Sequence, residues 1–116
     1  MEIIPQEQGN ISVLHLKGRL DLATGAELKT EIKNRFDQEK TQIHLNLTEV
    51  EFINSSGLGA LVSVMKETRV KKGRLTLSNM ATYVKEIFEI TQLSHIFEIY
   101  ETEAEAIASY QQVTAK

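Results

Sequence analysis

Residues 52–61 read Phe-Ile-Asn-Ser-Ser-Gly-Leu-Gly-Ala-Leu, and this stretch decides the fold. Its apolar beginning ends a predicted strand, and its hydroxyl residues and glycines lead directly into a predicted amphipathic helix. The start of a helix leaves backbone N–H groups unpaired and carries the positive end of the helix dipole. Ser55 or Ser56 at this junction would therefore accommodate a phosphate group. The structural alternative is that Ser55 or Asn54 only caps the helix, while the glycines allow a tight turn.

Size and composition restrict the class of protein. The 116 residues suit one domain, 1–116, which is large enough to bury a core without covalent staples. Lys and Arg number 13 against 16 Asp and Glu, giving a formal charge of -3 without a long block of either sign. This balance argues against nucleic acid or an anionic membrane as the main partner. The absence of cysteine excludes a disulfide, a thiolate metal site and a cysteine nucleophile.

The sequence carries no recognisable targeting segment. Its first residues lack the basic region and the apolar run of a signal peptide. No later segment approaches the roughly 18 consecutive apolar residues that span a bilayer. We therefore expect a soluble cytoplasmic protein without direct membrane insertion.

Strand and helix patterns alternate on both sides of the opening stretch. Before it, the sequence predicts a strand over 11–16, a short extended piece over 18–20, a helix from Asp21 or Thr24 to before Thr41, and a strand over 43–53. After it, we expect a helix that Gly73 ends, a strand at Leu75 and Leu77, a helix around Val84 to Phe88, a strand over 96–100 and a helix over 104–110.

This alternation predicts an α/β fold. Right-handed crossovers would place the strands in a mostly parallel mixed sheet with about four α-helices, and hairpin-like amino-terminal strands would add an antiparallel edge. In such sheets, functional groups gather at the carboxyl ends of the strands. The Asn54-Ser55-Ser56-Gly57 turn lies at such an end, so its position and its chemistry agree.

Four blocks of sequence resemble the STAS domain of bacterial anti-sigma factor antagonists. They are Gly18-Arg19-Leu20-Asp21 with Thr24, Leu45-Asn46-Leu47, Phe52 to Gly59, and Ile87-Phe88-Glu89-Ile90 before Leu93. The blocks occur in order and at compatible spacing, and the likeness covers nearly the whole chain. The resemblance implies the STAS fold and a regulatory, non-enzymatic role that needs no cofactor.

The resemblance also implies a partner switch. By correspondence with the family, Ser55 is the residue phosphorylated by a partner serine kinase, a GHKL-type ATPase that doubles as the anti-sigma factor, and a PP2C-type phosphatase would reverse the modification. The unmodified form would bind the kinase and free its client. The partner-binding residues implied are Asp21, Thr24, Asn54, Ser56, Gly57, Leu58 and Gly59. At position 54 the family usually has aspartate, so Asn54 removes a negative charge beside the acceptor.

Other roles remain open at this point. The same fold could serve as a STAS adaptor in secretion, motility or a signalling scaffold, or as a subunit of a lipid transporter. Asp21 and Thr24 could simply cap the first helix. Met80, Tyr83 and Val84 could extend an apolar docking surface, although helical spacing favours packing in the core.

Catalysis and metal binding are not expected. Ser55 and Ser56 lack the Gly-x-Ser-x-Gly context of a nucleophile elbow, and the chain has no Gly-Lys-Ser/Thr phosphate loop. His15, His44 and His95 are scattered without acidic or cysteine companions at ligand spacing, which argues against a metal site.

Overall fold

The computed structural model describes residues 1–114, the last four of them as helical backbone. The elements in chain order are β1 (Glu2–Gln8), β2 (Ile11–Leu20), α1 (Leu22–Asp37), β3 (Gln42–Ile53), α2 (Ser55–Val70), β4 (Arg74–Ser78), α3 (Thr82–Ile90), the 3₁₀ turn η1 (Leu93–His95), β5 (Glu98–Tyr100) and α4 (Glu103–Thr114). The sheet order is β1-β2-β3-β4-β5. Only the β1–β2 pair is antiparallel. The predicted α/β fold, with a mostly parallel mixed sheet and an antiparallel amino-terminal edge, is confirmed.

The antiparallel edge is built differently from the prediction. Strand β1 was not predicted, because its residues are mostly exposed and include Pro5, a pattern that suits an edge strand. The extended piece over 18–20 is not a separate strand but the end of β2, which continues beside β3 through two shifts of register. Gly18, with φ 114°, lies at the second shift, where a residue with a side chain would be strained. The last strand begins at Glu98 rather than at residue 96.

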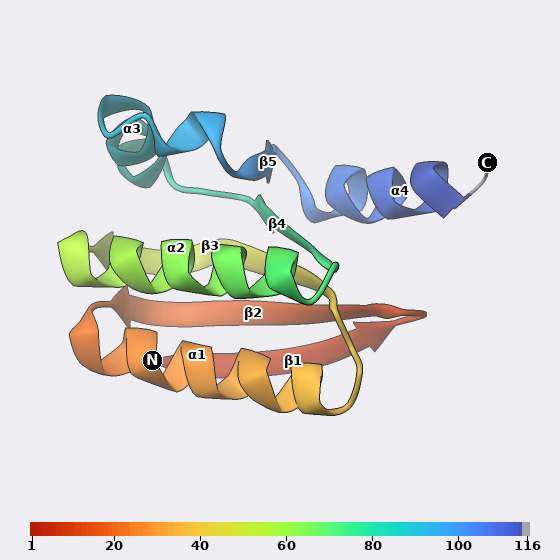
Figure 1. The fold of residues 1–116 in the computed structure, drawn as a ribbon. Coiled ribbons are helices and arrows are strands. Elements are labelled where there is room, and N and C mark those ends of the chain that lie inside the picture. Colours follow the sequence, from red (N-terminus) through yellow and green to blue (C-terminus); the bar gives the residue numbers. More distant parts are fainter. Residues whose placement is uncertain (115–116) are drawn as a thin grey trace.

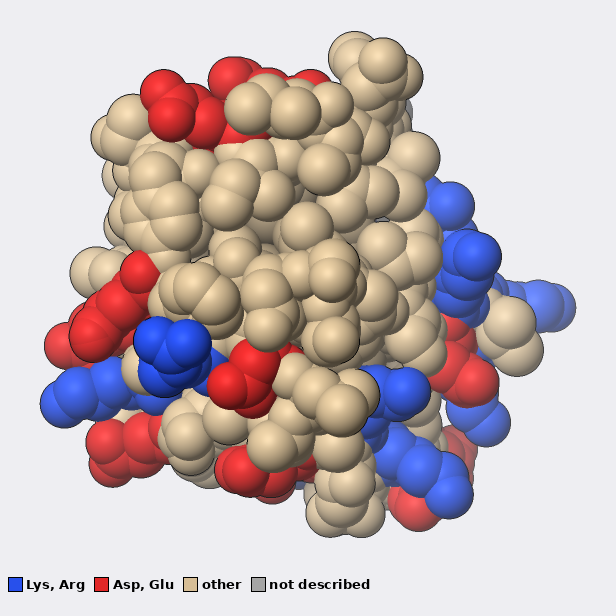
Figure 2. Space-filling model, turned by 90° about the vertical axis from the view of Figure 1, so that its left-hand side faces the viewer, with Lys and Arg blue, Asp and Glu red and all other residues tan. Residues whose placement is uncertain are grey.

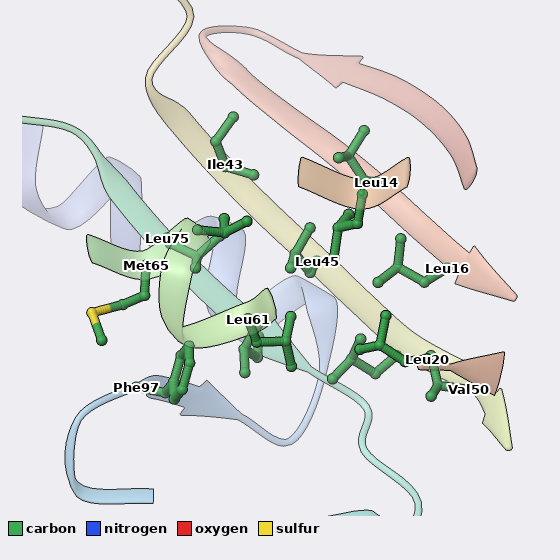
Figure 3. Packing of buried hydrophobic residues seen from close by; sticks show 14 of the residues in the cluster. Leu14, Leu16, Leu20, Ile43, Leu45, Val50, Leu61, Met65, Leu75 and Phe97 are labelled. Atoms are coloured by element: carbon green, nitrogen blue, oxygen red, sulfur yellow. The ribbon is translucent and has the colours of Figure 1, made fainter. Parts of the chain in front are cut away.

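Most of the apolar core lies between the sheet and the helices α1 and α2. Leucines and isoleucines that alternate along β2, β3 and β4 face these helices, and Figure 3 shows Leu14, Leu45, Leu61 and their neighbours converging there. Phe97 lies in the part of the core near α3, where its ring packs edge-on against the Phe88 ring with centroids 5.5 Å apart. This core fixes where α1 and α2 begin relative to the strands.

The opposite face of the sheet carries α4 and is more polar. Its apolar part is a small cluster of Ile11, Val13 and Tyr110, with Ile107 partly buried against it. Figure 1 shows α4 displaced toward one end of the molecule, away from the starts of α1 and α2. In the part of the chain that the structure describes, no helix has both the length and the apolar character needed to cross a membrane.

Candidate functional site at the start of helix α2

Strand β3 passes into helix α2 at a turn that Asn54 caps. The Asn54 side-chain oxygen accepts the backbone N–H of Gly57 at 2.9 Å, and its carbonyl oxygen accepts that of Leu58 at 2.9 Å. Of the two residues considered as the cap, the structure therefore uses Asn54 rather than Ser55. Ser55 is the first residue of α2, its side chain is exposed, and no partner for its hydroxyl is found within residues 1–114. The hydroxyl lies at the positive end of a helix of 16 residues.

Glycine at position 57 allows α2 to approach β2 closely. A Cβ atom there would lie 2.2 Å from the carbonyl oxygen of Leu20, well inside any permitted contact. Gly57 is buried and Leu58 is partly buried against the main core, whereas Gly59 is exposed and has open space where a Cβ would lie. The close approach of Gly57 is thus observed, while contact of these three residues with a partner stays a prediction.

A second cap holds the loop beside the junction. The Asp21 carboxylate accepts the Thr24 backbone N–H at 3.2 Å, and the Thr24 hydroxyl oxygen accepts the Asp21 backbone N–H at 2.9 Å. The hydrogen bonds from Thr24, with a smaller contribution from the positive charge of Arg19, lower the pKa of Asp21. Capping by Asp21 and Thr24 is therefore observed, and their contact with a partner stays a prediction.

The two capped helix starts lie at one edge of the sheet. The Leu20 carbonyl oxygen at the end of β2 accepts the Asn54 backbone N–H at 3.3 Å, which joins the loop before α1 to the loop before α2. In Figure 1 both helices begin at the same end of the molecule, where β2 and β3 finish. The structure therefore brings Asp21 and Asn54, which lie far apart in sequence, into one site with Ser55 and Ser56.

Figure 2 views the molecule from this end. A broad uncharged area occupies its centre, and charged side chains gather mostly around the margins. A shallow hollow of about 240 Å³ between α1 and α2 is lined by Leu22, Ala26, Lys29, Ser56, Gly59 and Ala60. Leu22, at the start of α1, is 75% exposed and adds an apolar side chain beside this hollow. The site thus has the character of a contact surface.

Three further residues lie at this end, namely Arg19, Phe52 and Tyr83, and the sequence analysis did not count them among the partner-binding residues. The Arg19 guanidinium stacks over the Phe52 ring, with its central carbon 3.9 Å from the ring centroid. The Tyr83 hydroxyl donates a hydrogen bond to the Glu51 carbonyl oxygen. Arg19 stands in the Gly-Arg-Leu-Asp block that carries the family resemblance, so the sequence contained a signal for it. The pairing of Arg19 with Phe52 depends on strand register, which the sequence pattern does not reveal.

For Met80, Tyr83 and Val84 the sequence left two alternatives, an apolar docking surface and packing in the core, and these residues differ in burial. Val84 is 1% exposed and belongs to the core, whereas Tyr83 is 39% exposed and remains available for contact. Met80 is partly buried against the core. Core packing is therefore confirmed for Val84 but not for Tyr83.

Comparison with known proteins identifies the family. A model of the STAS domain matches residues 2–106 of the chain. The chain belongs to the STAS domain family. This STAS domain is 30% identical, over 105 residues, to the anti-sigma-B factor antagonist of Listeria monocytogenes, with 90% of this chain and 91% of the relative covered.

Solved structures place the fold in the same family. The Bacillus anti-sigma factor antagonist SpoIIAA in its unphosphorylated form is 25% identical, with a TM-score of 0.74 and coverage of 95% of this STAS domain and 98% of that chain. Its phosphorylated form gives a TM-score of 0.72, with coverage of 94% of this STAS domain and 99% of that chain. A sulfate transporter family protein from Wolinella succinogenes is 12% identical, with a TM-score of 0.82 and coverage of 94% of this chain and 91% of that chain. At this level of identity, the likeness shows a shared fold alone.

The histidines of this STAS domain lie away from the junction. His44 is fully buried beneath α4, where its ring nitrogens lie 2.7 Å from the Thr76 hydroxyl and 2.8 Å from the Ser78 hydroxyl. His15 lies 3.0 Å from the Glu103 carboxylate. Within residues 1–114, no group of three or more His, Cys, Asp or Glu side chains is arranged to hold a metal ion. His44 therefore has a structural setting, paired with two hydroxyls inside the fold.

Proposed function

We propose that this STAS domain is an anti-sigma factor antagonist controlled by phosphorylation of Ser55. The unmodified protein binds a GHKL-type serine kinase that is also the anti-sigma factor, and thereby frees its client. Phosphorylation releases the complex, and a PP2C-type phosphatase restores the binding form. The observation that carries the proposal is the exposed Ser55 hydroxyl at the first position of α2, at the end of the molecule whose surface is largely uncharged.

The physical basis of the switch is the charge that a phosphate adds. Unmodified Ser55 is small and neutral, so the surrounding surface can pack against a partner. A phosphoserine carries about -1.5 to -2 charges at pH 7, and these must be stripped of water if the same surface is to remain docked. The complex therefore dissociates when Ser55 is modified.

The free protein tolerates the same charge at little cost. The N-terminus of α2 favours an anion, and the first turn of this helix contains no acidic residue. Asn54 caps the helix without adding the negative charge that an aspartate would place beside Ser55. The fold need not rearrange, so the switch acts through the surface alone.

The family relatives support this proposal. The Listeria relative is an anti-sigma-B factor antagonist, and SpoIIAA has been solved in unphosphorylated and phosphorylated forms. Both forms match this chain with nearly the same TM-score, 0.74 and 0.72, as expected for a modification that leaves the fold in place. The role is regulatory and requires no catalytic group in this chain.

The test compares phosphate-resistant and phosphate-mimicking baits. Wild-type, Ser55→Ala and Ser55→Asp proteins are used to recover partners from the native cell extract, and phosphosites on the recovered wild type are mapped by mass spectrometry. We expect Ser55→Ala to retain a GHKL-type ATPase, Ser55→Asp to lose it, and the wild type to carry phosphate on Ser55.

Ser56 provides the matched control, because it is also an exposed serine in the first turn of α2. In Ser56→Ala the phosphate should still be found on Ser55, which separates the acceptor from its neighbour. If the Ser55 variants recover the same partner and the wild type carries no phosphate, the proposal is wrong and the chain acts as a constitutive STAS adaptor.

A further inference from the structure

Arg19 differs from Arg35 and Arg74, which both form ion pairs within this chain. The Arg35 guanidinium pairs with the Glu31 carboxylate at 2.5 Å, and that of Arg74 with Glu98 at 2.6 Å. Arg19 forms no ion pair within the residues that the structure describes, yet its guanidinium is held over the Phe52 ring. Stacking fixes the orientation of the group while leaving its N–H donors free for another acceptor. The charge of Arg19 reaches the Asp21 carboxylate without forming a close ion pair with it, so this surface guanidinium can bind a carboxylate from outside the chain.

Tyr83 borders the same end of β3 from the other side. Its ring projects from α3, whose Val84 and Phe88 face the core. Its hydroxyl donates a hydrogen bond to the carbonyl oxygen of Glu51, the residue before Phe52. Arg19 from β2 and Phe52 from β3 are therefore in contact, and Tyr83 from α3 is hydrogen-bonded to the backbone of the residue before Phe52. We call these three residues the β3-end ridge.

The ridge is close to the switch in sequence and in space. Phe52 precedes Ser55 by three residues, and the strand that carries Arg19 is hydrogen-bonded to Asn54 through Leu20. Strands β2 and β3 end on the side of the molecule that Figure 2 shows, where the surface is largely uncharged. A partner that covers Ser55 would thus also reach the ridge.

We propose that the β3-end ridge determines which partner binds, by receiving an acidic side chain of the anti-sigma factor kinase on Arg19, flanked by apolar contact with Phe52 and Tyr83. This inference rests on the proposed function. Arginine and tyrosine are enriched among the residues that dominate binding energy at protein interfaces. Because stacking orders the Arg19 side chain in advance, less conformational freedom is lost on binding. Ser55 then decides whether the kinase binds, and the ridge decides which kinase binds.

The experiment measures the dissociation constant of the kinase recovered with the Ser55→Ala bait, without ATP, by isothermal titration calorimetry. Arg19→Glu should weaken binding by about 100-fold or more, since it opposes two carboxylates. Arg19→Lys should weaken it by about 5- to 10-fold, because lysine keeps the charge but loses the planar fork. Tyr83→Ala should weaken it by about 10-fold through lost aromatic contact.

Lys17→Glu is the matched control. Lys17 is an exposed cation on the same strand, two residues before Arg19, and should change binding by less than about threefold. Thermal unfolding of each variant checks that the fold is intact. Exchange of one kinase carboxylate for arginine should restore binding to Arg19→Glu, and this would identify the partner of Arg19.

The outcomes separate the two proposals. If the Ser55→Ala bait recovers the kinase but the Arg19 and Tyr83 variants bind within twofold of the wild type, the ridge inference fails and the switch proposal stands. If Lys17→Glu weakens binding as much as Arg19→Glu, general electrostatic attraction explains the loss, and the inference of a specific contact at Arg19 fails. If no kinase is recovered, both proposals fail.

Discussion

At the scale of single residues, the site depends on how closely α2 approaches the end of β2. Gly57 faces the backbone of Leu20, and Gly25 in α1 faces Ala60 in α2, where a Cβ on Gly25 would lie 2.7 Å from the Cβ of Ala60. Neither Gly57 nor Gly25 has a positive φ, so backbone strain does not explain these glycines. Space is the reason for both, and it holds the starts of α1 and α2 together beside Ser55.

The first prediction contrasts two glycines of the same helix. Gly57→Ala should lower the free energy of unfolding by about 2 to 4 kcal/mol, because the new methyl group would collide with the Leu20 carbonyl and force the helix away from β2. Gly59→Ala should instead raise it by about 0.5 to 1 kcal/mol, because its Cβ meets open space and glycine is a poor helix former. Urea unfolding of both variants measures the difference, and equal effects would contradict this explanation.

At the scale of elements, α4 is attached to the sheet largely through polar contacts. The Arg74 guanidinium on β4 donates to the Glu98 carboxylate of β5 at 3.0 and 2.6 Å and to the Ser109 hydroxyl of α4 at 3.0 Å. It also lies 4.4 Å from the centroid of the Tyr110 ring. The Arg74 side chain therefore connects β4, β5 and α4. Apolar burial between α4 and the sheet is limited to the small cluster around Ile11 and Val13.

The second prediction follows from this connection. Arg74→Met keeps much of the side-chain volume but removes the guanidinium, so α4 should open more often. We expect amide hydrogen exchange over 103–110 to accelerate by about tenfold, whereas exchange in the centre of β3 stays unchanged.

Lys85→Met provides the control for Arg74→Met. The Lys85 ammonium also pairs with a carboxylate, that of Glu101, at 2.6 Å, but this pair is exposed and joins no part of α4. Its loss should leave exchange over 103–110 within about twofold of the wild type. Equal acceleration in both variants would show that Arg74 has no special role in holding α4.

At the scale of the whole molecule, the sheet separates an apolar layer from a partly polar one. Leu45 on β3 faces the main core, and the adjacent His44 faces α4 between Thr76 and Ser78. Burial is the main cause that lowers the pKa of His44 to about 4 from its ordinary value of 6.5, and the negative charge of Glu103 only partly opposes it. His44 is therefore neutral in the folded protein at pH 7.

The third prediction is a loss of global stability in mild acid. Between pH 6.5 and pH 4, the unfolded chain binds a proton at His44 that the folded protein does not, so stability falls as the pH decreases through this window. The expected contribution is about 2 kcal/mol between pH 7 and pH 5. Urea unfolding at several pH values measures it.

Two histidine variants isolate this contribution. His44→Gln should flatten the stability profile between pH 7 and pH 5, because no buried group then gains a proton only on unfolding. His95→Gln, in the turn η1, should keep the wild-type slope, since His95 is not buried. A profile of His44→Gln as steep as that of the wild type would show that another group causes the loss.

The sequence by itself determined the features that depend on neighbouring residues. Apolar periodicity placed four helices and the strands after β1, and the change from strand to helix at Asn54-Ser55 marked the candidate site, because caps and helix starts are local structures. The family blocks pointed to the STAS fold before any contact between the strands was known, and the family match over residues 2–106 agrees.

Only the tertiary structure decided the features that need segments distant in sequence. Strand β1 lacks a clear apolar pattern and forms because its backbone pairs with β2. The register of β2 on β3 places Arg19 over Phe52, and the packing of α3 leaves Tyr83 exposed while it buries Val84. Gly57 is needed only because Leu20 lies against it. Strand register and burial depend on contacts made across the whole fold, which is why local sequence patterns do not reveal them.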